Sequence, residues 1–254
     1  MAGGAGPLTM GGDDVGVDAP TARELLEEVH SRITGEQIGE VVALLESKSR
    51  GFRARLRAEA IVAADEATLR EVLRSIFVSR RRVGAIFGVR PAQEVRDMIA
   101  ELLHGDAAVG DRLASFCRQV DLPELAAAEL AGELLHFYDP AQHWLCSRFV
   151  YNVHTRTGAL PLLIDEGYEL EGDGIGESYE RIGAAIRSLD ASAEASSFRP
   201  QGGGALATDV FLACVYGVYM NTVLGLKMSQ EFNSLIPPLP QLARRLLGVH
   251  KMEV

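Results

Sequence analysis

Residues 210–220 read VFLACVYGVYM, a run of eleven residues without a charged side chain inside the longer apolar stretch 205–228. Asp209 precedes the run, Asn221 follows it, and Lys227 lies near the end of the stretch. A membrane-spanning helix needs about 20 consecutive apolar residues, so this run is too short to span a bilayer. We therefore expect a core helix without membrane contact, covered by its own domain or by a partner subunit.

The rest of the sequence is dominated by helical periodicity. Apolar residues recur three and four positions apart, as in Leu25, Leu26, Val29 and Ile33, and glycine or proline separates most such segments. These patterns predict an all-α fold, a multi-helix globular domain. The expected organisation is a flexible N-terminal tail (1–20), a helical domain (21–190), a linker rich in serine and glycine (191–204), and a C-terminal helical segment (205–254) that packs on the domain or on a partner.

One segment, residues 144–164, departs from this periodicity. Residues 144–150 are rich in aromatic and apolar side chains, residues 155–158 read TRTG, and residues 159–164 form a second apolar run. Two such runs joined by a turn-forming sequence are typical of a β-hairpin. The sequence therefore predicts a small β-hairpin insertion in the helical fold.

The composition is that of an ordinary globular protein, with 47% apolar residues, 24% charged residues and a formal net charge of -10 over 254 residues. Its three cysteines form no C-x-x-C pair, so we expect reduced thiols and no iron–sulfur cluster held by this chain alone. The first residues lack the basic and apolar regions of a signal peptide. The expected localisation is cytoplasmic.

Positive charge is concentrated in residues 48–90, which contain eleven basic residues and four acidic ones. Arginine suits phosphate and carboxylate oxygens, so this segment is a candidate surface for nucleic acid or another anionic partner. The alternative is a solvated face neutralised by the protein's own carboxylates, such as Glu66 and Glu71. The candidate anion-binding residues are Arg50, Arg53, Arg57, Arg80, Arg81 and Arg82.

Four metal-capable side chains occur within eleven residues: His136, Asp139, His143 and Cys146. The spacing His143-x-x-Cys146 allows chelation from one helix, and zinc is the metal that such ligands favour. The alternative explains Asp139-Pro140 as a helix start and Cys146 as a core residue. No cofactor is predicted otherwise.

The sequence LPELA at 122–126, followed by AGELLHF at 131–137 and by Asp139-Pro140, resembles the helical core of helix-hairpin-helix domains, which occur in base-excision DNA glycosylases and restriction-associated proteins. The resemblance covers about residues 91–150 and implies helical architecture there. The family's phosphate-binding glycines are replaced by Glu124 and Ala126, and its catalytic lysine falls on Ala127 or Ala128. Glycosylase activity is therefore not implied.

No nucleophile elbow, metalloprotease motif or kinase signature occurs in the sequence. We therefore expect a non-catalytic accessory or scaffold subunit that acts through protein–protein contacts, with another protein subunit or a second copy as partner. One alternative is a nucleic-acid-binding module of the DNA-repair or phage-defence type that uses the 48–90 segment. The other is a metal-dependent enzyme.

Overall fold

The computed structural model describes residues 15–192, 197–198, 204–227 and 237–253. In these residues the protein is helical and contains no strand, which confirms the all-α prediction. The helices are α1 (Ala19–His30), α2 (Gly35–Leu56), α3 (Ala58–Val62), α4 (Glu66–Ser75), α5 (Val83–Val89), α6 (Ala92–His104), α7 (Val109–Gln119), α8 (Glu124–Tyr138), the 3-10 helix η1 (Leu160–Leu162), α9 (Ile175–Ala191), α11 (Gly204–Lys227) and α13 (Leu239–Leu246).

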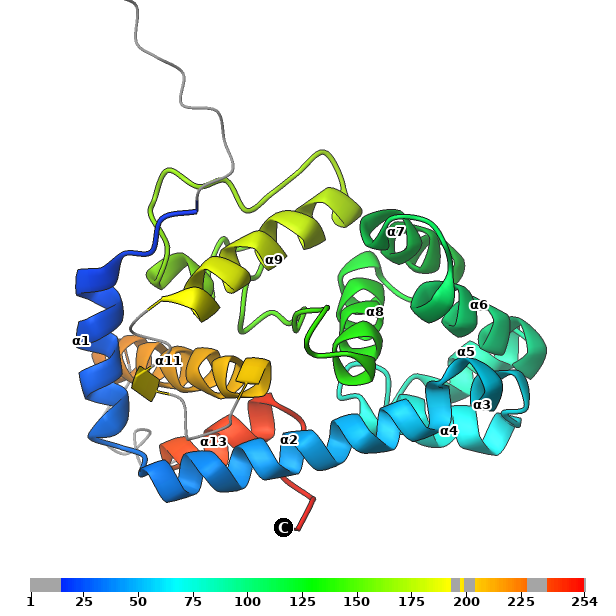
Figure 1. Ribbon diagram of the computed structural model, residues 1–254, viewed down its shortest axis with the longest axis horizontal. Coiled ribbons are helices and arrows are strands. Elements are labelled where there is room, and N and C mark those ends of the chain that lie inside the picture. The colour runs from blue at the N-terminus through cyan, green and yellow to red at the C-terminus, as the bar shows by residue number, and fades with distance from the viewer. Residues whose placement is uncertain (1–14, 193–196, 199–203, 228–236, 254) are drawn as a thin grey trace, which may run out of the picture.

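Helices α2 and α8 connect two groups of helices (Figure 1). In the first group α11 contacts α1 and α13, and both α11 and α13 pack on α2. In the second group α6 contacts α3, α4 and α7 beyond the other end of α2. Helix α8 packs on α2, α6 and α7, and eleven of its fifteen residues are buried. It therefore lies at the centre of the molecule.

The long helix α2 is defined by its sequence at both ends. Thr34 accepts a hydrogen bond from the backbone N–H of Gln37, and the Gln37 side chain accepts one from the backbone N–H of Thr34, which completes a capping box. Beyond Leu56 the backbone of Arg57 leaves the helical conformation, with ψ at 153°. The 22 residues between these points make α2 long enough to contact both groups of helices.

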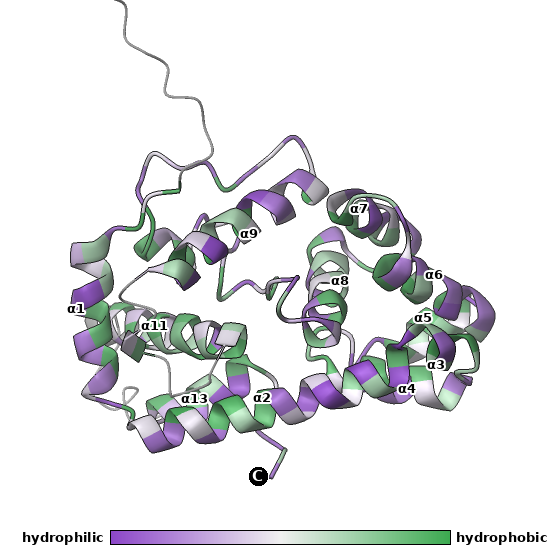
Figure 2. Ribbon diagram, viewed as in Figure 1, coloured by the Kyte–Doolittle hydropathy of each residue, from purple (hydrophilic) through white to green (hydrophobic). Residues whose placement is uncertain are grey.

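Helix α11 contains the apolar run 210–220. Residues 210–215 are fully buried, and the helix is apolar along most of its length (Figure 2). Its segment Gly204–Val223 is long and apolar enough to cross a membrane, but 67% of the apolar window is buried inside the fold. Because α1, α2 and α13 cover it, α11 serves as a core helix of this chain.

The predicted β-hairpin at residues 144–164 is wrong. This segment folds into turns, the 3-10 helix η1 and two isolated bridges, one between Asn152 and Thr157 and one between Ile164 and Val17. The Ser147 carbonyl accepts hydrogen bonds from the backbone N–H groups of Val150 and Tyr151, which turns the chain where a strand would continue. The aromatic and apolar residues are buried by packing on the surrounding helices, and this burial produces the pattern that resembles a hairpin.

Trp144 attaches the irregular segment to α9. Its ring stacks on Tyr179 with centroids 4.5 Å apart, and its Nε1 donates to the Tyr179 carbonyl at 2.7 Å. The Arg187 guanidinium lies 4.7 Å from the indole ring. Between these contacts Gly183 leaves room for the indole, because a Cβ built on Gly183 would lie 1.9 Å from the ring.

The two flexible segments predicted from sequence lie partly outside the described residues. Of the tail predicted at 1–20, residues 15–20 are described: Ala19 and Pro20 begin α1. The residues before them contact the segment before α9, since Val17 forms a bridge with Ile164 and Asp18 N–H donates to the Leu163 carbonyl. Most of the predicted linker at 191–204 falls outside the described ranges. The C-terminal segment packs on α1 and α2 of its own chain.

Substituting Gly183 with alanine should destabilise the fold by about 1–3 kcal/mol, because the new methyl group overlaps the Trp144 ring. A Cβ added to Gly39 in α2 would have no neighbouring atom within 4 Å, so Gly39→Ala should stabilise by about 0.5–1 kcal/mol through helix propensity. Urea denaturation of both variants measures the two effects. Equal stabilities for the two variants would contradict the close approach of Trp144 to α9.

Candidate functional site

The turn between α4 and α5, residues 76–82, combines arginines with an exposed aromatic ring. The Phe77 side chain is 56% exposed, and the Arg80 guanidinium lies 4.7 Å from the centroid of its ring. Arg81 is exposed and has no ion pair or hydrogen bond with the described residues. The sequence contains no acidic residue between positions 72 and 93, so the turn is strongly positive.

Residues from the C-terminal end of the chain extend this positive region. His250 is exposed, and partial burial together with Lys251, Arg80 and Arg245 lowers its pKa below the ordinary value. Arg80 therefore lies near residues that are distant in sequence. We define the basic surface as Phe77, Arg80, Arg81, Arg82, Arg245 and Lys251.

Neutralisation by the protein's own carboxylates occurs elsewhere in the 48–90 segment. Glu71 pairs with Arg55 at 2.8 Å, and Glu66 pairs with Arg70 at 2.6 Å. These two arginines fit the alternative of a neutralised, solvated face. The arginines of the turn at 76–82 do not fit this alternative, because they form no ion pair with a carboxylate of the described residues.

The predicted cations on α2 have different surroundings. Arg53 Nε donates to the Tyr138 carbonyl at 3.2 Å, so its side chain satisfies the last turn of α8. Arg50 lies 3.7 Å from Glu46 and is exposed, and Arg57 is exposed where α2 ends. Lys48, the first cation of the segment, is buried and takes no part in the surface.

Lys48 belongs instead to a buried charge network at the centre of the fold. Its Nζ lies 3.3 Å from Glu133 Oε2 of α8, 3.5 Å from the Leu247 carbonyl, and 3.8 Å from the centroid of the Phe137 ring. Burial lowers the pKa of Lys48 and raises that of Glu133, and the attraction between the two opposes both shifts. The network joins α2, α8 and the residue after α13.

A second buried pair continues the network. His136 Nε2 lies 2.8 Å from Asp209 Oδ2 of α11, and His136 Nδ1 lies 2.9 Å from the His143 carbonyl. Burial lowers the pKa of His136, but the Asp209 carboxylate and its hydrogen bond more than offset this, so the pKa lies above its ordinary value. His136 Nδ1 is therefore hydrogen-bonded within the protein, and Nε2 lies in ion-pair contact with the Asp209 carboxylate.

The four predicted metal ligands have other interactions in the structure. Asp139 accepts a hydrogen bond from the Ala141 backbone N–H, and burial lowers the pKa of His143 to about 4. Cys146 is partly buried, and desolvation raises the pKa of its thiol far above the usual range. Among the described residues no group of three or more histidine, cysteine, aspartate or glutamate side chains is arranged to hold a metal. A zinc site at His136, Asp139, His143 and Cys146 stays a prediction.

Sequence reasoning missed the carboxylates of the buried network. Asp209 interrupts an otherwise apolar helix, and Glu133 lies among apolar residues of α8 together with Glu129 and His136. Charged residues on the buried face of a helix need a partner, so this placement was the available signal. Their partners, Lys48 for Glu133 and His136 for Asp209, come from α2 and α8, and no sequence spacing indicates that pairing.

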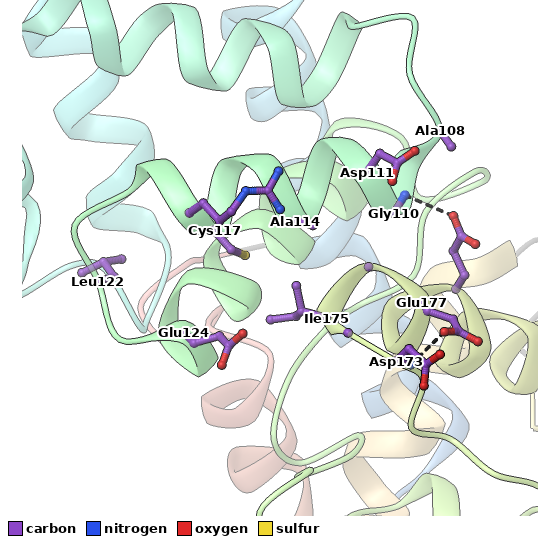
Figure 3. Close-up of a pocket in the computed structure, with 14 residues that line it drawn as sticks. Ala108, Gly110, Asp111, Ala114, Cys117, Leu122, Glu124, Asp173, Ile175 and Glu177 are labelled. Atoms are coloured by element: carbon purple, nitrogen blue, oxygen red, sulfur yellow. Dashed lines mark hydrogen bonds between the residues drawn. The ribbon is translucent and has the colours of Figure 1, made fainter.

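An acidic groove of about 700 Å³ lies between α7, the start of α8 and the start of α9 (Figure 3). Glu177 accepts a hydrogen bond from the Asp173 backbone N–H at 2.8 Å, and Glu180 accepts one from the Gly110 backbone N–H at 3.2 Å. The hydrogen bond from Asp173 and the Arg181 guanidinium lower the pKa of Glu177. Glu177 and Glu180 are thus engaged by the protein itself.

Comparison with known proteins yields no match to a protein-family model, to a curated protein or to a solved structure. Residues 91–150 fold into α6, α7, α8 and the turns that follow. The resemblance of this region to helix-hairpin-helix domains stays a prediction.

Replacing Lys48 with methionine leaves the Glu133 carboxylate buried without its cation, and should lower the free energy of unfolding by about 3–5 kcal/mol. The double variant Lys48→Met, Glu133→Leu should recover most of this loss, because no unpaired charge remains. Arg50→Met is the control, since its exposed pair should be worth less than about 1 kcal/mol. Urea denaturation gives all three values, and a double variant as unstable as Lys48→Met would argue against the pairing.

Folded-state protonation of His136 should make stability depend on pH. Because its pKa is raised on folding, the stabilisation is complete below the unfolded value of 6.5 and is lost as pH rises through the folded-state pKa. The free energy of unfolding of the wild type should therefore fall relative to that of His136→Gln between neutral and alkaline pH. Exposed His154→Gln serves as the control, and an identical pH dependence of wild type and His136→Gln would disprove the coupling to Asp209.

Proposed function

We propose that this protein is a binding module for single-stranded nucleic acid, which it holds through the basic surface. The observation that carries the proposal is an exposed phenylalanine, Phe77, beside the Arg80 guanidinium in a turn without acidic residues. Single-stranded nucleic acid is bound by this combination of cations for phosphates and aromatic rings for bases.

The charge distribution supports an anionic partner. The protein as a whole carries a formal charge of -10, so the positive charge of the basic surface is a local feature that attracts polyanions to this one place. Arg81 and Arg82 are exposed, and Arg245 and Lys251 add two exposed cations from the C-terminal end. Phosphates are spaced regularly along a nucleic acid, so several such cations can be used at once.

The exposed ring distinguishes single strands from duplexes and from acidic proteins. An exposed phenylalanine stabilises an unstacked base by stacking, whereas the bases of a duplex are already stacked. An acidic protein face would use the arginines but gain little from this ring. The aromatic contribution to affinity is therefore the property that separates the partners.

One argument for an accessory or scaffold subunit, the need of the apolar helix for a partner, no longer applies. An apolar helix needs cover from its own domain or from a partner subunit, and α11 is covered by α1, α2 and α13 of the same chain. A non-catalytic role in a larger complex, and a metal-dependent activity, stay predictions. Binding of nucleic acid fits an accessory role, since it needs no catalytic residue.

The double variant Arg80→Glu, Arg81→Glu should weaken binding of a fluorescent single-stranded oligonucleotide of about 16 nucleotides, measured by anisotropy at several salt concentrations. Each lost phosphate contact should reduce the slope of log affinity against log salt by about 0.7, hence by about 1.4 for two contacts. Phe77→Ala should cost about 1–3 kcal/mol through lost stacking.

The matched control is Arg118→Glu, which reverses an exposed charge on α7, outside the basic surface. Absence of binding at low salt, or equal losses in the control and the Arg80, Arg81 variant, would refute the proposal. If poly-glutamate displaces the oligonucleotide at equal charge and Phe77→Ala has no effect, the partner is an acidic protein instead.

A further inference from the structure

The acidic groove of Figure 3 adjoins an apolar cavity of about 500 Å³ between the start of α8, residues 146–154 and the first half of α9. Glu124 from the start of α8 and Ile175 from the start of α9 line both volumes. The two volumes therefore form one composite groove, acidic at one end and apolar at the other. It shares no residue with the basic surface, so it is a separate feature of the molecule.

The apolar end offers packing contacts, because the charges on its wall are paired within the chain. Glu129 accepts hydrogen bonds from the Arg148 backbone N–H at 3.0 Å and from Arg148 Nε at 3.1 Å. Glu171 pairs with Arg156 at 3.0 Å. The remaining wall suits an apolar side chain of a partner. Its apolar residues are Leu113, Pro123, Leu125, Val153, Ile175 and Ile182.

The acidic end contains carboxylates that the chain leaves unpaired. Five carboxylates line it, and Arg118 supplies the one guanidinium among the described lining residues. Two of the five accept backbone N–H hydrogen bonds. The other three, Asp111, Glu124 and Asp173, are exposed, and their carboxylates form no ion pair or hydrogen bond with the described residues. This end of the groove therefore attracts cations.

The turn at 76–82 presents the complementary groups on the same chain. Phe77 is an exposed apolar ring, and the Arg80 guanidinium lies 4.7 Å from its centroid. In the groove, the carboxylate of Glu124 and the apolar side chain of Ile175 line the same space. A uniformly acidic face would leave the ring without a partner, whereas the composite groove accepts a ring and a guanidinium together.

We propose that a second copy of this chain docks its turn at 76–82 into the composite groove. Phe77 packs on the apolar wall, and Arg80 and Arg81 pair with carboxylates of the acidic end. Each copy provides one turn and one groove, so the contact joins two different surfaces. Because the formal charge of -10 makes two copies repel each other overall, the attraction depends on these local charges.

The contact covers the basic surface, so self-association and binding of nucleic acid exclude each other. This exclusion rests on the proposed function, whereas the contact between copies does not. A single-stranded oligonucleotide that binds should return the associated protein to monomers. Association measured without nucleic acid tests the contact alone, so the two proposals fail separately.

Sedimentation equilibrium of the full-length protein without nucleic acid provides the first test. At low salt and high protein concentration the mass should exceed the 27.4 kDa of the monomer. At about 1 M salt, where charges are screened beyond about 3 Å, it should return to that value. A monomer under both conditions, or association that salt does not weaken, would overturn the proposal.

Two charge-reversal variants locate the contact. Arg80→Glu, Arg81→Glu alters the turn, and Glu124→Arg, Asp173→Arg alters the groove. Each variant alone should remain monomeric at low salt. Their equimolar mixture should associate, because the first keeps an unaltered groove and the second an unaltered turn. A mixture that stays monomeric, or either variant associating as strongly as the wild type, would exclude this contact.

The matched control is Glu24→Arg, Glu27→Arg, which makes the same change in net charge at two exposed positions of α1. It should associate like the wild type, and an equal loss there would contradict a specific groove. Phe77→Ala keeps every charge and should weaken association by about tenfold or more, the effect of a lost buried phenylalanine. Unchanged association of Phe77→Ala would rule out packing of the ring on the apolar wall.

Discussion

The fold depends on the need to satisfy charges that are buried at its centre. Lys48 and Glu133 form one pair, His136 and Asp209 form another, and the carboxylate of each pair lies on a different helix from its cation. A buried charge without a partner costs several kcal/mol, so α2, α8 and α11 have to meet in one register. Apolar packing alone would tolerate a shift of one helix along another, whereas these pairs would not.

This constraint explains the central position of α8. The helix carries Glu129, Glu133 and His136 on its buried surface, and each is engaged by a different part of the chain: residue 148, α2 and α11. Gly132 adds to this arrangement, since a Cβ on it would lie 2.2 Å from the Cβ of Cys146. The loop after α8 therefore lies directly against the helix that precedes it.

Local sequence signals predict the helical architecture but not what depends on contacts between distant segments. Helical periodicity and the apolar run at 210–220 identify an all-α fold and a core helix, because burial of one face imposes that spacing. The predicted hairpin at 144–164 is wrong because apolar residues buried in turns produce the same composition as residues buried in strands.

Sequence alone groups Lys48 with the surface cations, since nothing adjacent to it reveals Glu133. The turn at 76–82 is recognisable because its charges are contiguous, whereas His136 and Asp209 are distant in sequence and meet only in the folded chain.

The environment of Trp144 gives the protein a built-in optical reporter. It is the single tryptophan of the chain, it is 8% exposed, and it stacks on Tyr179 of α9. Indole emission shifts to shorter wavelength in a dry environment and responds to charges and rings in contact with it, here the Arg187 guanidinium and the Tyr179 phenol. The fluorescence spectrum of the unlabelled protein thus monitors the junction of the irregular segment with α9 through this one indole.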